Sequence, residues 1–231
     1  MARTIAIVED EPVIRENYAD LFRRQGYRVN TYAGRAEAGA ALHSRLPDLA
    51  ILDIGLGEEF DGGFELCRQL RSLSSTLPII FLTARDSDID TVAGLRVGAD
   101  DYVTKAVSLD QLSARVSALF RRTEAMQAQT PIEHSLQDGP LRLDPEQMRV
   151  SWRDQEVALT VTEIWILHAL IRHPGHVKSR DQLMEAANTY VDLATITSHI
   201  KRIRKKFLHI DPDFDAIEAV YGAGYRWLSQ A

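Results

Sequence analysis

The sequence has little cysteine and no long hydrophobic run, and each shortage excludes a class of protein. One cysteine, Cys67, among 231 residues rules out a disulfide framework and a cysteine-rich metal site, which fits a reducing compartment. The longest apolar runs, such as IAIV and PIIFL, are far too short to span a bilayer. The N-terminal MARTIAIVED carries acids where a secretory signal needs its apolar stretch. We therefore expect a cytoplasmic protein without a membrane partner.

The chain also lacks a net positive charge, although one short strip of it is strongly basic. Its formal net charge is -6. Residues 1–120 hold 13 Lys+Arg against 18 Asp+Glu, a net of -5, whereas residues 121–231 hold 14 against 15, a net of -1. The strip KRIRKK, residues 201–206, lies in the nearly neutral half, where it can make a local positive field. The acidity and the basic strip therefore belong to parts with different partners.

Length and pattern indicate two domains. A chain of 231 residues is about enough for two domains of roughly 100 residues each. Amphipathic order breaks down between Arg122 and Pro140, in a segment that contains two prolines and a glycine. We place the first domain at residues 1–122, a linker at 123–137 and the second domain at 138–231.

Short apolar runs alternate with amphipathic stretches in the first domain. The runs are residues 5–8, 29–32, 49–52, 79–82 and 102–103. Segments between them, such as PVIRENYADLFRRQG, have apolar residues at helical spacing. A βα unit repeated five times predicts an α/β fold with a parallel sheet and helices on both of its faces.

Helix signals and a final hairpin dominate the second domain. The T-x-x-E pattern at 160–163 and the S-x-x-Q pattern at 179–182 are capping boxes for two helices. Asp192 is the expected N-cap of a third, long helix that ends near Phe207. Strand-like pieces flank the helices, and GAG supplies the turn of a terminal hairpin. Three helices and a hairpin predict an α+β winged helix-turn-helix.

Polar side chains stand where the strands of the first domain end. Glu9 and Asp10 follow the first strand, Asp53 the third and Lys105 the fifth, while Thr83 ends the fourth. Because ligands of an open parallel sheet bind at the carboxyl ends of its strands, these side chains should converge on one cleft. Clustered acids need a cation, and oxygen ligands suit Mg²⁺. A carboxylate beside a metal, a lysine and a hydroxyl is equipped to accept a phosphoryl group.

The basic strip belongs to a predicted helix with two faces. Ile196, Ile200, Ile203 and Phe207 recur at i, i+4, i+7 and i+11, forming an apolar stripe that packs inward. The side chains expected to face out are Thr197, Ser198, Lys201, Arg202 and Lys205. The short polar ones permit close approach to base edges, and the cations suit DNA phosphates. His199, beside the stripe, is either a phosphate contact or a packed histidine.

These residues carry a resemblance to a known family. VEDE, AILD, FLTAR and GADDYVTK resemble the receiver domain of two-component response regulators, and LTVTE, TSHIKRIRKK and GAGYRW resemble the output domain of the OmpR/PhoB subfamily. The resemblance covers nearly the whole chain except the linker. It implies a phosphorylation-activated transcriptional regulator rather than an enzyme. The implied partners are a sensor histidine kinase, double-stranded promoter DNA and RNA polymerase.

The resemblance also implies roles for individual residues of the first domain. Asp53 accepts the phosphoryl group from the kinase, and Lys105 binds a phosphoryl oxygen. Mg²⁺ is held by Asp10, with Glu9 nearby, helped by Asp53 and the backbone carbonyl of Gly55.

Further implied roles concern the switch, the dimer and the DNA surface. Thr83 and Tyr102 are paired switch residues that report phosphorylation, and the phosphorylated protein forms a homodimer through the face of the fourth and fifth helices. The charged candidates on that face are Asp100, Asp101, Arg115 and Arg122. Thr91 and Gln111 stand where the family tends to have a base and an acid. The candidate DNA-binding residues are Thr197, Ser198, His199, Lys201, Arg202, Arg204, Lys205 and Arg226.

The sequence departs from the family at several positions. Ala106 replaces a proline after the lysine, and because a cis bond before alanine would cost ~3 kcal/mol, we expect either a trans bond there or a strained site that the pocket enforces. The loop IGLGEEFDGG has Gly57 where the family usually has proline, and is one residue longer. Ala194 and Tyr221 stand where basic residues are usual, and the segment NTYV before the third helix is short.

Two other functions fit part of the pattern. A haloacid-dehalogenase-like phosphatase also uses an aspartyl phosphate and Mg²⁺, but it needs a second acid where this chain has Gly55. A phosphorylation-independent DNA-binding protein with a vestigial receiver would not need the full set of Asp10, Asp53, Thr83 and Lys105, although the alanine after the lysine leaves room for it.

Overall fold

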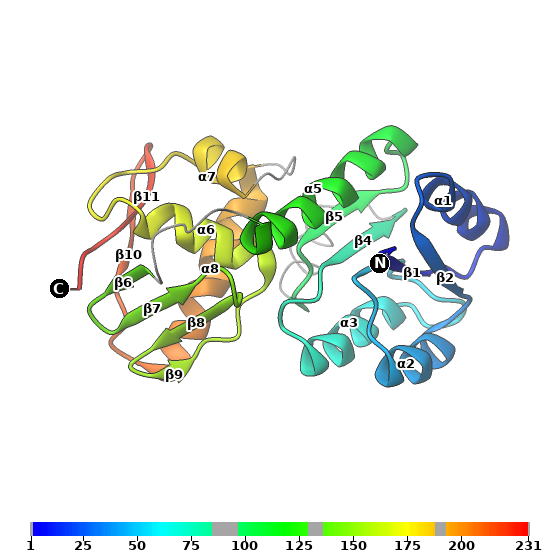
Figure 1. Ribbon diagram of the computed structural model, residues 1–231, viewed down its shortest axis with the longest axis horizontal. Coiled ribbons are helices and arrows are strands. Elements are labelled where there is room, and N and C mark those ends of the chain that lie inside the picture. Colours follow the sequence, from blue (N-terminus) through cyan, green and yellow to red (C-terminus); the bar gives the residue numbers. More distant parts are fainter. Residues whose placement is uncertain (1, 85–96, 129–135, 188–192, 231) are drawn as a thin grey trace. The chain divides into compact units, whose positions relative to one another are not determined.

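The structure is a computed structural model that describes residues 2–84, 97–128, 136–187 and 193–230 (Figure 1). The chain divides into two compact units, Met1–Ser117 and Ala118–Ala231. Thr91, Asp192 and the segment 188–191 lie outside the described residues, as do the side chains of Arg122 and Ala194.

The first unit is built on a parallel sheet of five strands. These are β1 (Thr4–Val8), β2 (Arg28–Tyr32), β3 (Leu49–Leu52), β4 (Ile79–Thr83) and β5 (Asp101–Thr104). They lie in the order β2-β1-β3-β4-β5, and every pairing is parallel. The predicted α/β fold is therefore confirmed. Because the order reverses at β1, the edge beyond the carboxyl ends of β1 and β3 is where such sheets bind ligands.

The described helices of the first unit cover both faces of the sheet (Figure 1). They are α1 (Pro12–Arg24), α2 (Arg35–Ser44), α3 (Gly62–Leu73) and α5 (Leu109–Ala128). Helices α2 and α3 lie on one face, and α1 and α5 on the other. Strands β3 and β4 are buried along their whole length, as the uninterrupted apolar runs of a doubly covered parallel sheet require. Helix α5 continues to Ala128, six residues into the segment that we predicted as a linker.

The described part of the second unit combines strands with three helices that begin and end within it. An antiparallel sheet holds β6 (Leu136–Asp138), β7 (Leu141–Asp144), β8 (Arg149–Trp152) and β9 (Gln155–Glu156). The helices are α6 (Val161–Ile171), α7 (Arg180–Ala186) and α8 (Leu193–Ile210), and the terminal hairpin pairs β10 (Ile217–Val220) with β11 (Gly224–Trp227). This arrangement confirms the predicted winged helix-turn-helix.

Both predicted capping boxes are present. The side chains of Thr160 and Ser179 accept from the backbone N–H three residues on, and the Glu163 and Gln182 side chains accept in return. The apolar stripe of α8 is also confirmed, with Ile196, Ile200, Ile203 and Phe207 all buried. Among the described helices none has the length and apolar character needed to cross a membrane.

Candidate phosphoacceptor site and DNA-binding helix

Three carboxylates converge beyond the carboxyl ends of β1 and β3. Glu9, Asp10 and Asp53 each place an oxygen so that the three atoms lie within 4.8 Å of one another. Glu9 and Asp53 are buried, whereas Asp10 is exposed. Parallel strands end at one edge of a sheet, which is why residues 43 positions apart meet here. Three oxygen donors open to solvent on one side suit Mg²⁺, which keeps several waters when it binds to proteins.

Lys105 joins this acidic group from the end of β5. Its Nζ donates to Asp53 Oδ2 at 2.7 Å and to the Glu9 carboxylate at 2.8 Å. Burial alone would lower the pKa of the Lys105 ammonium, but the hydrogen bonds and charges of Asp53 and Glu9 outweigh it and raise the pKa. Lys105 therefore carries its positive charge beside Asp53 at neutral pH.

The surroundings of Glu9 and Asp53 hold both carboxylates in place. Burial raises the pKa of Glu9, against the hydrogen bond from Lys105 that lowers it. Asp53 Oδ1 accepts from the Ile54 N–H at 2.6 Å. Arg15 Nη1 donates to the backbone carbonyls of Glu9 at 2.7 Å and Asp10 at 3.1 Å, so α1 fixes the loop after β1. One oxygen of Asp53 thus faces Lys105, and the other is anchored to the backbone.

The loop after Asp53 forms a small hairpin over residues 56–59. Leu56 N donates to Glu59 O at 3.0 Å, and Glu59 N returns a bond to Leu56 O at 3.1 Å. Gly57 has a φ of 62°, the positive value that the first central position of a type II′ turn requires. Proline, whose φ is fixed near −65°, cannot take this conformation. The departure from the family at Gly57 is therefore a different loop rather than a neutral substitution.

The predicted switch residues lie on the neighbouring strands. Thr83 is buried at the end of β4. Tyr102 on β5 is also buried, and its ring is tilted against Phe81 at a centroid distance of 6.4 Å. The Tyr102 side chain is therefore turned inward in this structure. No described peptide bond is cis, so the bond between Lys105 and Ala106 is trans, as expected.

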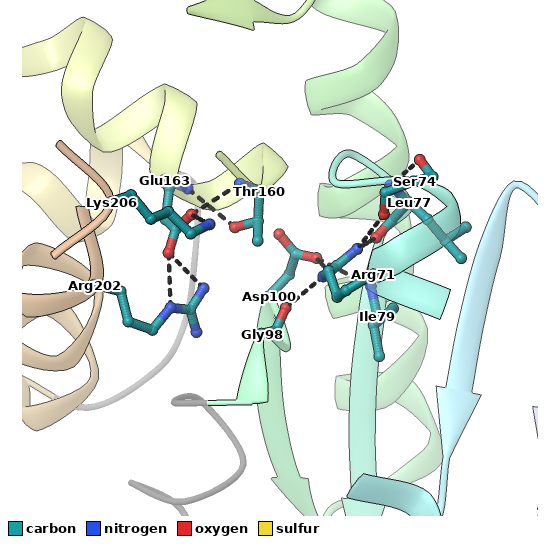
Figure 2. Close-up of polar contacts among 10 residues, drawn as sticks. All are labelled: Arg71, Ser74, Leu77, Ile79, Gly98, Asp100, Thr160, Glu163, Arg202 and Lys206. Carbon is teal, nitrogen blue, oxygen red and sulfur yellow. Dashed lines mark hydrogen bonds and ion pairs between the residues drawn. The ribbon is translucent and has the colours of Figure 1, made fainter. Parts of the chain in front are cut away.

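Asp100 does not lie on a surface, and its assignment to a dimer face is wrong. Its side chain is fully buried, and Oδ2 accepts from Arg71 Nη2 at 2.7 Å and from the Ile79 N–H at 3.0 Å. Figure 2 shows the same guanidinium donating to the backbone carbonyls of Gly98 and Leu77. Asp100 thus ties α3 to the start of β5 within one chain.

Asp101 and Arg115 pair with each other inside the chain. Arg115 Nη1 lies 2.9 Å from Asp101 Oδ2, which joins the start of β5 to α5. Asp101 is buried, and Arg115 is mostly so. The sequence placed both on the dimer face, and the structure adds that they already have an internal partner.

A buried acid on α6 holds two of the cations of α8. Glu163 is fully buried; Oε1 accepts from Arg202 Nε at 2.7 Å and Oε2 from Lys206 Nζ at 2.6 Å (Figure 2). Arg202 is buried with it, so the prediction that Arg202 faces out is wrong. Ser198 is buried too, and His199 is fully buried, as one of its two interpretations required. The sequence analysis assigned Glu163 only to the capping box with Thr160, and it did not predict the ion pairs with Arg202 and Lys206.

The remaining cations of α8 divide into two groups. Lys201 and Lys205 are exposed, with Thr197 partly exposed on the turn before them. Arg204 instead donates twice to the carbonyl of Ile217, at 3.1 and 2.7 Å, and thereby ties α8 to the terminal hairpin. Tyr225 adds to this tie, because its ring lies beneath Arg204 and its hydroxyl is 3.4 Å from Thr197 Oγ1.

Arg226 lies on β11 of the hairpin. Its side chain pairs with Glu218 across the strand pair β10–β11. The Glu218 carboxylate therefore weakens the electrostatic attraction between this candidate DNA contact and a phosphate.

Two family models match the chain. Residues 5–117 match the response regulator receiver domain, and residues 154–227 match the C-terminal domain of transcriptional regulatory proteins. The first match contains the carboxylates and Lys105, and the second contains α6, α7, α8 and the hairpin.

Curated relatives are similar over nearly the whole length. The phosphate regulon transcriptional regulatory protein PhoB of Rhizobium meliloti is 41% identical over 230 residues, which cover 97% of this chain and 98% of the relative. The transcriptional regulatory protein CreB of Escherichia coli is 37% identical over 227 residues, 96% of each chain. The crystal structure of DrrB, a Thermotoga maritima OmpR/PhoB homologue, matches with a TM-score of 0.51 at 27% identity, covering 99% of this chain and 100% of DrrB. With a receiver unit and a winged-helix unit both matched, the chain belongs to the OmpR/PhoB family of two-component response regulators, which are DNA-binding transcriptional regulators.

Proposed function

We propose that this protein accepts a phosphoryl group on Asp53 from a sensor histidine kinase and, in that state, binds promoter DNA as a homodimer. The observation that carries the proposal is the contact of the Lys105 ammonium with Asp53 and Glu9, in a pocket with Asp10. The arrangement offers a nucleophilic oxygen, a fixed positive charge and a set of oxygen donors at one place.

The Asp53 carboxylate is the group that forms the new P–O bond while the bond from phosphorus to the donor histidine nitrogen breaks. Lys105 stands within hydrogen-bond distance of Asp53, where its charge stabilises the oxygens of the transferring group. Mg²⁺, held by Asp10, Glu9, Asp53 and the carbonyl of Gly55, would supply further charge neutralisation when bound. The three carboxylates fit that ion, since it prefers oxygen donors.

The DNA-binding surface that we propose is smaller than the set suggested by the sequence. Lys201 and Lys205 contact phosphates, because both side chains are exposed on α8, and the partly exposed Thr197 approaches the base edges. Arg202 supports this surface indirectly, because it pairs with Glu163 and holds α8 against α6. Arg204 supports it by holding the terminal hairpin against α8. We also propose that the protein works in the cytoplasm and meets RNA polymerase at the promoter.

Replacing Lys205 with alanine should weaken binding to all DNA sequences alike. Each phosphate that a protein neutralises contributes about 0.9 to the slope of log K against log salt, so the slope should fall by about 0.9. Lys201→Ala should act in the same way, whereas Arg142→Ala, which removes an exposed cation from β7, should leave the slope unchanged. Fluorescence anisotropy on specific and random duplexes over a salt series measures this. An unchanged salt slope in both lysine variants would show that Lys201 and Lys205 on α8 do not contact DNA phosphates.

The phosphorylated state should be a dimer, which tests the proposed function as a whole. Beryllofluoride with Mg²⁺ mimics an aspartyl phosphate and should convert a mostly monomeric protein into a dimer in sedimentation velocity runs. Tandem half-sites about one helical turn apart, ~10–10.5 base pairs, would then present the same face of the duplex to both copies. Arg115→Ala should reduce the shift, because it removes the cation that holds Asp101 at the start of β5, on the proposed dimer face. An unchanged sedimentation coefficient in the mimic would contradict the switch.

A further inference from the structure

We propose that Arg35 is a positioning residue for the magnesium site and acts through the hairpin 56–59. The inference rests on the proposed function, because the ligands that it positions are those of the proposed magnesium site. Arg35 itself contacts none of them. A chain of contacts connects Arg35 to Glu59, and the hairpin connects Glu59 to Asp10 and Gly55.

The hairpin fixes the orientation of the Gly55 carbonyl. That carbonyl and the N–H of Leu56 belong to one planar peptide unit, so the direction of one sets the direction of the other. Leu56 N–H donates to Glu59 O at 3.0 Å. The peptide unit that carries a proposed metal ligand is therefore held by the far strand of the hairpin.

The hairpin also holds the carboxylate of Asp10. Gly57 N–H donates to Asp10 Oδ2 at 3.1 Å, a contact across 47 positions of the chain. Asp10 is the exposed member of the three carboxylates and has no burial to keep it in place. This bond leaves Oδ1 available to a metal and keeps the Asp10 carboxylate beside Glu9 and Asp53.

Arg35 anchors the hairpin to another element of the fold. Its Nε pairs with Glu59 Oε2 from the first residue of α2. Residues 57–60 are all exposed, and a Cβ placed on Gly57 would meet nothing within 4 Å, so packing does not hold the hairpin tip. Glu59 O also accepts from Gly62 N at 3.1 Å, so the same residue connects the hairpin to the start of α3. Loss of the Arg35–Glu59 pair should therefore loosen two proposed ligands together.

The test is a titration of the unphosphorylated full-length chain with Mg²⁺ alone, by isothermal calorimetry. Arg35→Ala and Glu59→Gln should each weaken the affinity for Mg²⁺ about three-fold, the scale of a half-exposed ion pair. The double variant should be no weaker than either single one. Arg23→Ala removes a comparable surface cation, paired with Glu16 and Asp20 on α1, and controls for the change in net charge.

A charge exchange separates positioning from a loss of structure. The combination of Arg35→Glu with Glu59→Arg restores the pair in reverse and should recover most of the affinity. Wild-type affinity in Arg35→Ala, tighter binding there, or no recovery in the exchanged protein would each overturn the role of Arg35. A wild-type chain that binds no Mg²⁺ at all would overturn the proposed metal site as well, which distinguishes the two failures.

Discussion

Asp53→Asn should abolish the uptake of a phosphoryl group. The amide has nearly the shape of the carboxylate and can still accept from the Ile54 N–H, so the pocket should keep its structure. It lacks the anionic oxygen that attacks phosphorus, and uptake should fall by at least about 100-fold. Intact mass spectrometry after incubation with a small phosphodonor and Mg²⁺ measures the loss directly.

Two controls accompany the labelling of Asp53→Asn: a variant that lacks an acid outside the pocket, and a wild-type sample from which the metal has been removed. Glu58→Gln removes an exposed carboxylate from the same loop and should label like the wild type. A chelator should prevent labelling of the wild type, because the acids around Asp53 then repel the incoming phosphoryl oxygens. A stable phosphoryl group on Asp53→Asn, at the wild-type level, would show that another residue is the acceptor.

Glu163→Gln should lower the free energy of unfolding of the second unit by about 3–5 kcal/mol, the usual cost of removing one partner from a buried ion pair. Glutamine can still form the capping box with Thr160, so the loss isolates the charge. The buried Arg202 and the partly buried Lys206 would then lose the charge of their shared carboxylate. The three tryptophans, at positions 152, 165 and 227, all lie in the second unit, so their fluorescence in urea reports on it alone.

The loss should depend on pH in a defined direction. Burial alone would raise the pKa of Glu163, but the charges of Arg202 and Lys206 outweigh it and hold the pKa far below the usual 4.5. A depressed pKa contributes stability that is complete above the unfolded value and is lost as pH falls below about 4.5. The difference in the free energy of unfolding between the wild type and Glu163→Gln should therefore become smaller as the pH falls below about 4.5. Glu156→Gln, on exposed β9, is the control, and equal urea midpoints for the two variants would contradict the prediction.

Strand ends were the most informative signal in the sequence. Apolar runs predict all five strands of the first unit, and the rule that ligands bind at the carboxyl ends of such strands predicts that Glu9, Asp10, Asp53 and Lys105 meet, as they do in the structure. Main-chain topology decides this convergence, and topology follows from periodicity. The hairpin 56–59 was not foreseen, because a two-residue turn with a single glycine leaves little pattern beyond the glycine itself.

Charged side chains beside an apolar stripe were the least predictable feature. His199, Arg202 and Lys206 recur at i, i+3 and i+7 along the flank of the stripe on α8, and that flank faces Glu163. Periodicity shows which side chains are apolar, but whether a cation meets solvent or a buried acid depends on a partner 39 residues away. Asp100 is a similar case, since Arg71 reaches it from a separate helix.

The tie between α8 and the terminal hairpin has a consequence for the thermodynamics of recognition. Arg204 and Tyr225 join the two elements during folding, so the hairpin and the exposed face of α8 meet the duplex already in register with each other. A preorganised surface loses little conformational entropy on association, which leaves more of the contact energy as affinity. Association should then lack the large negative heat-capacity change of segments that fold as they bind.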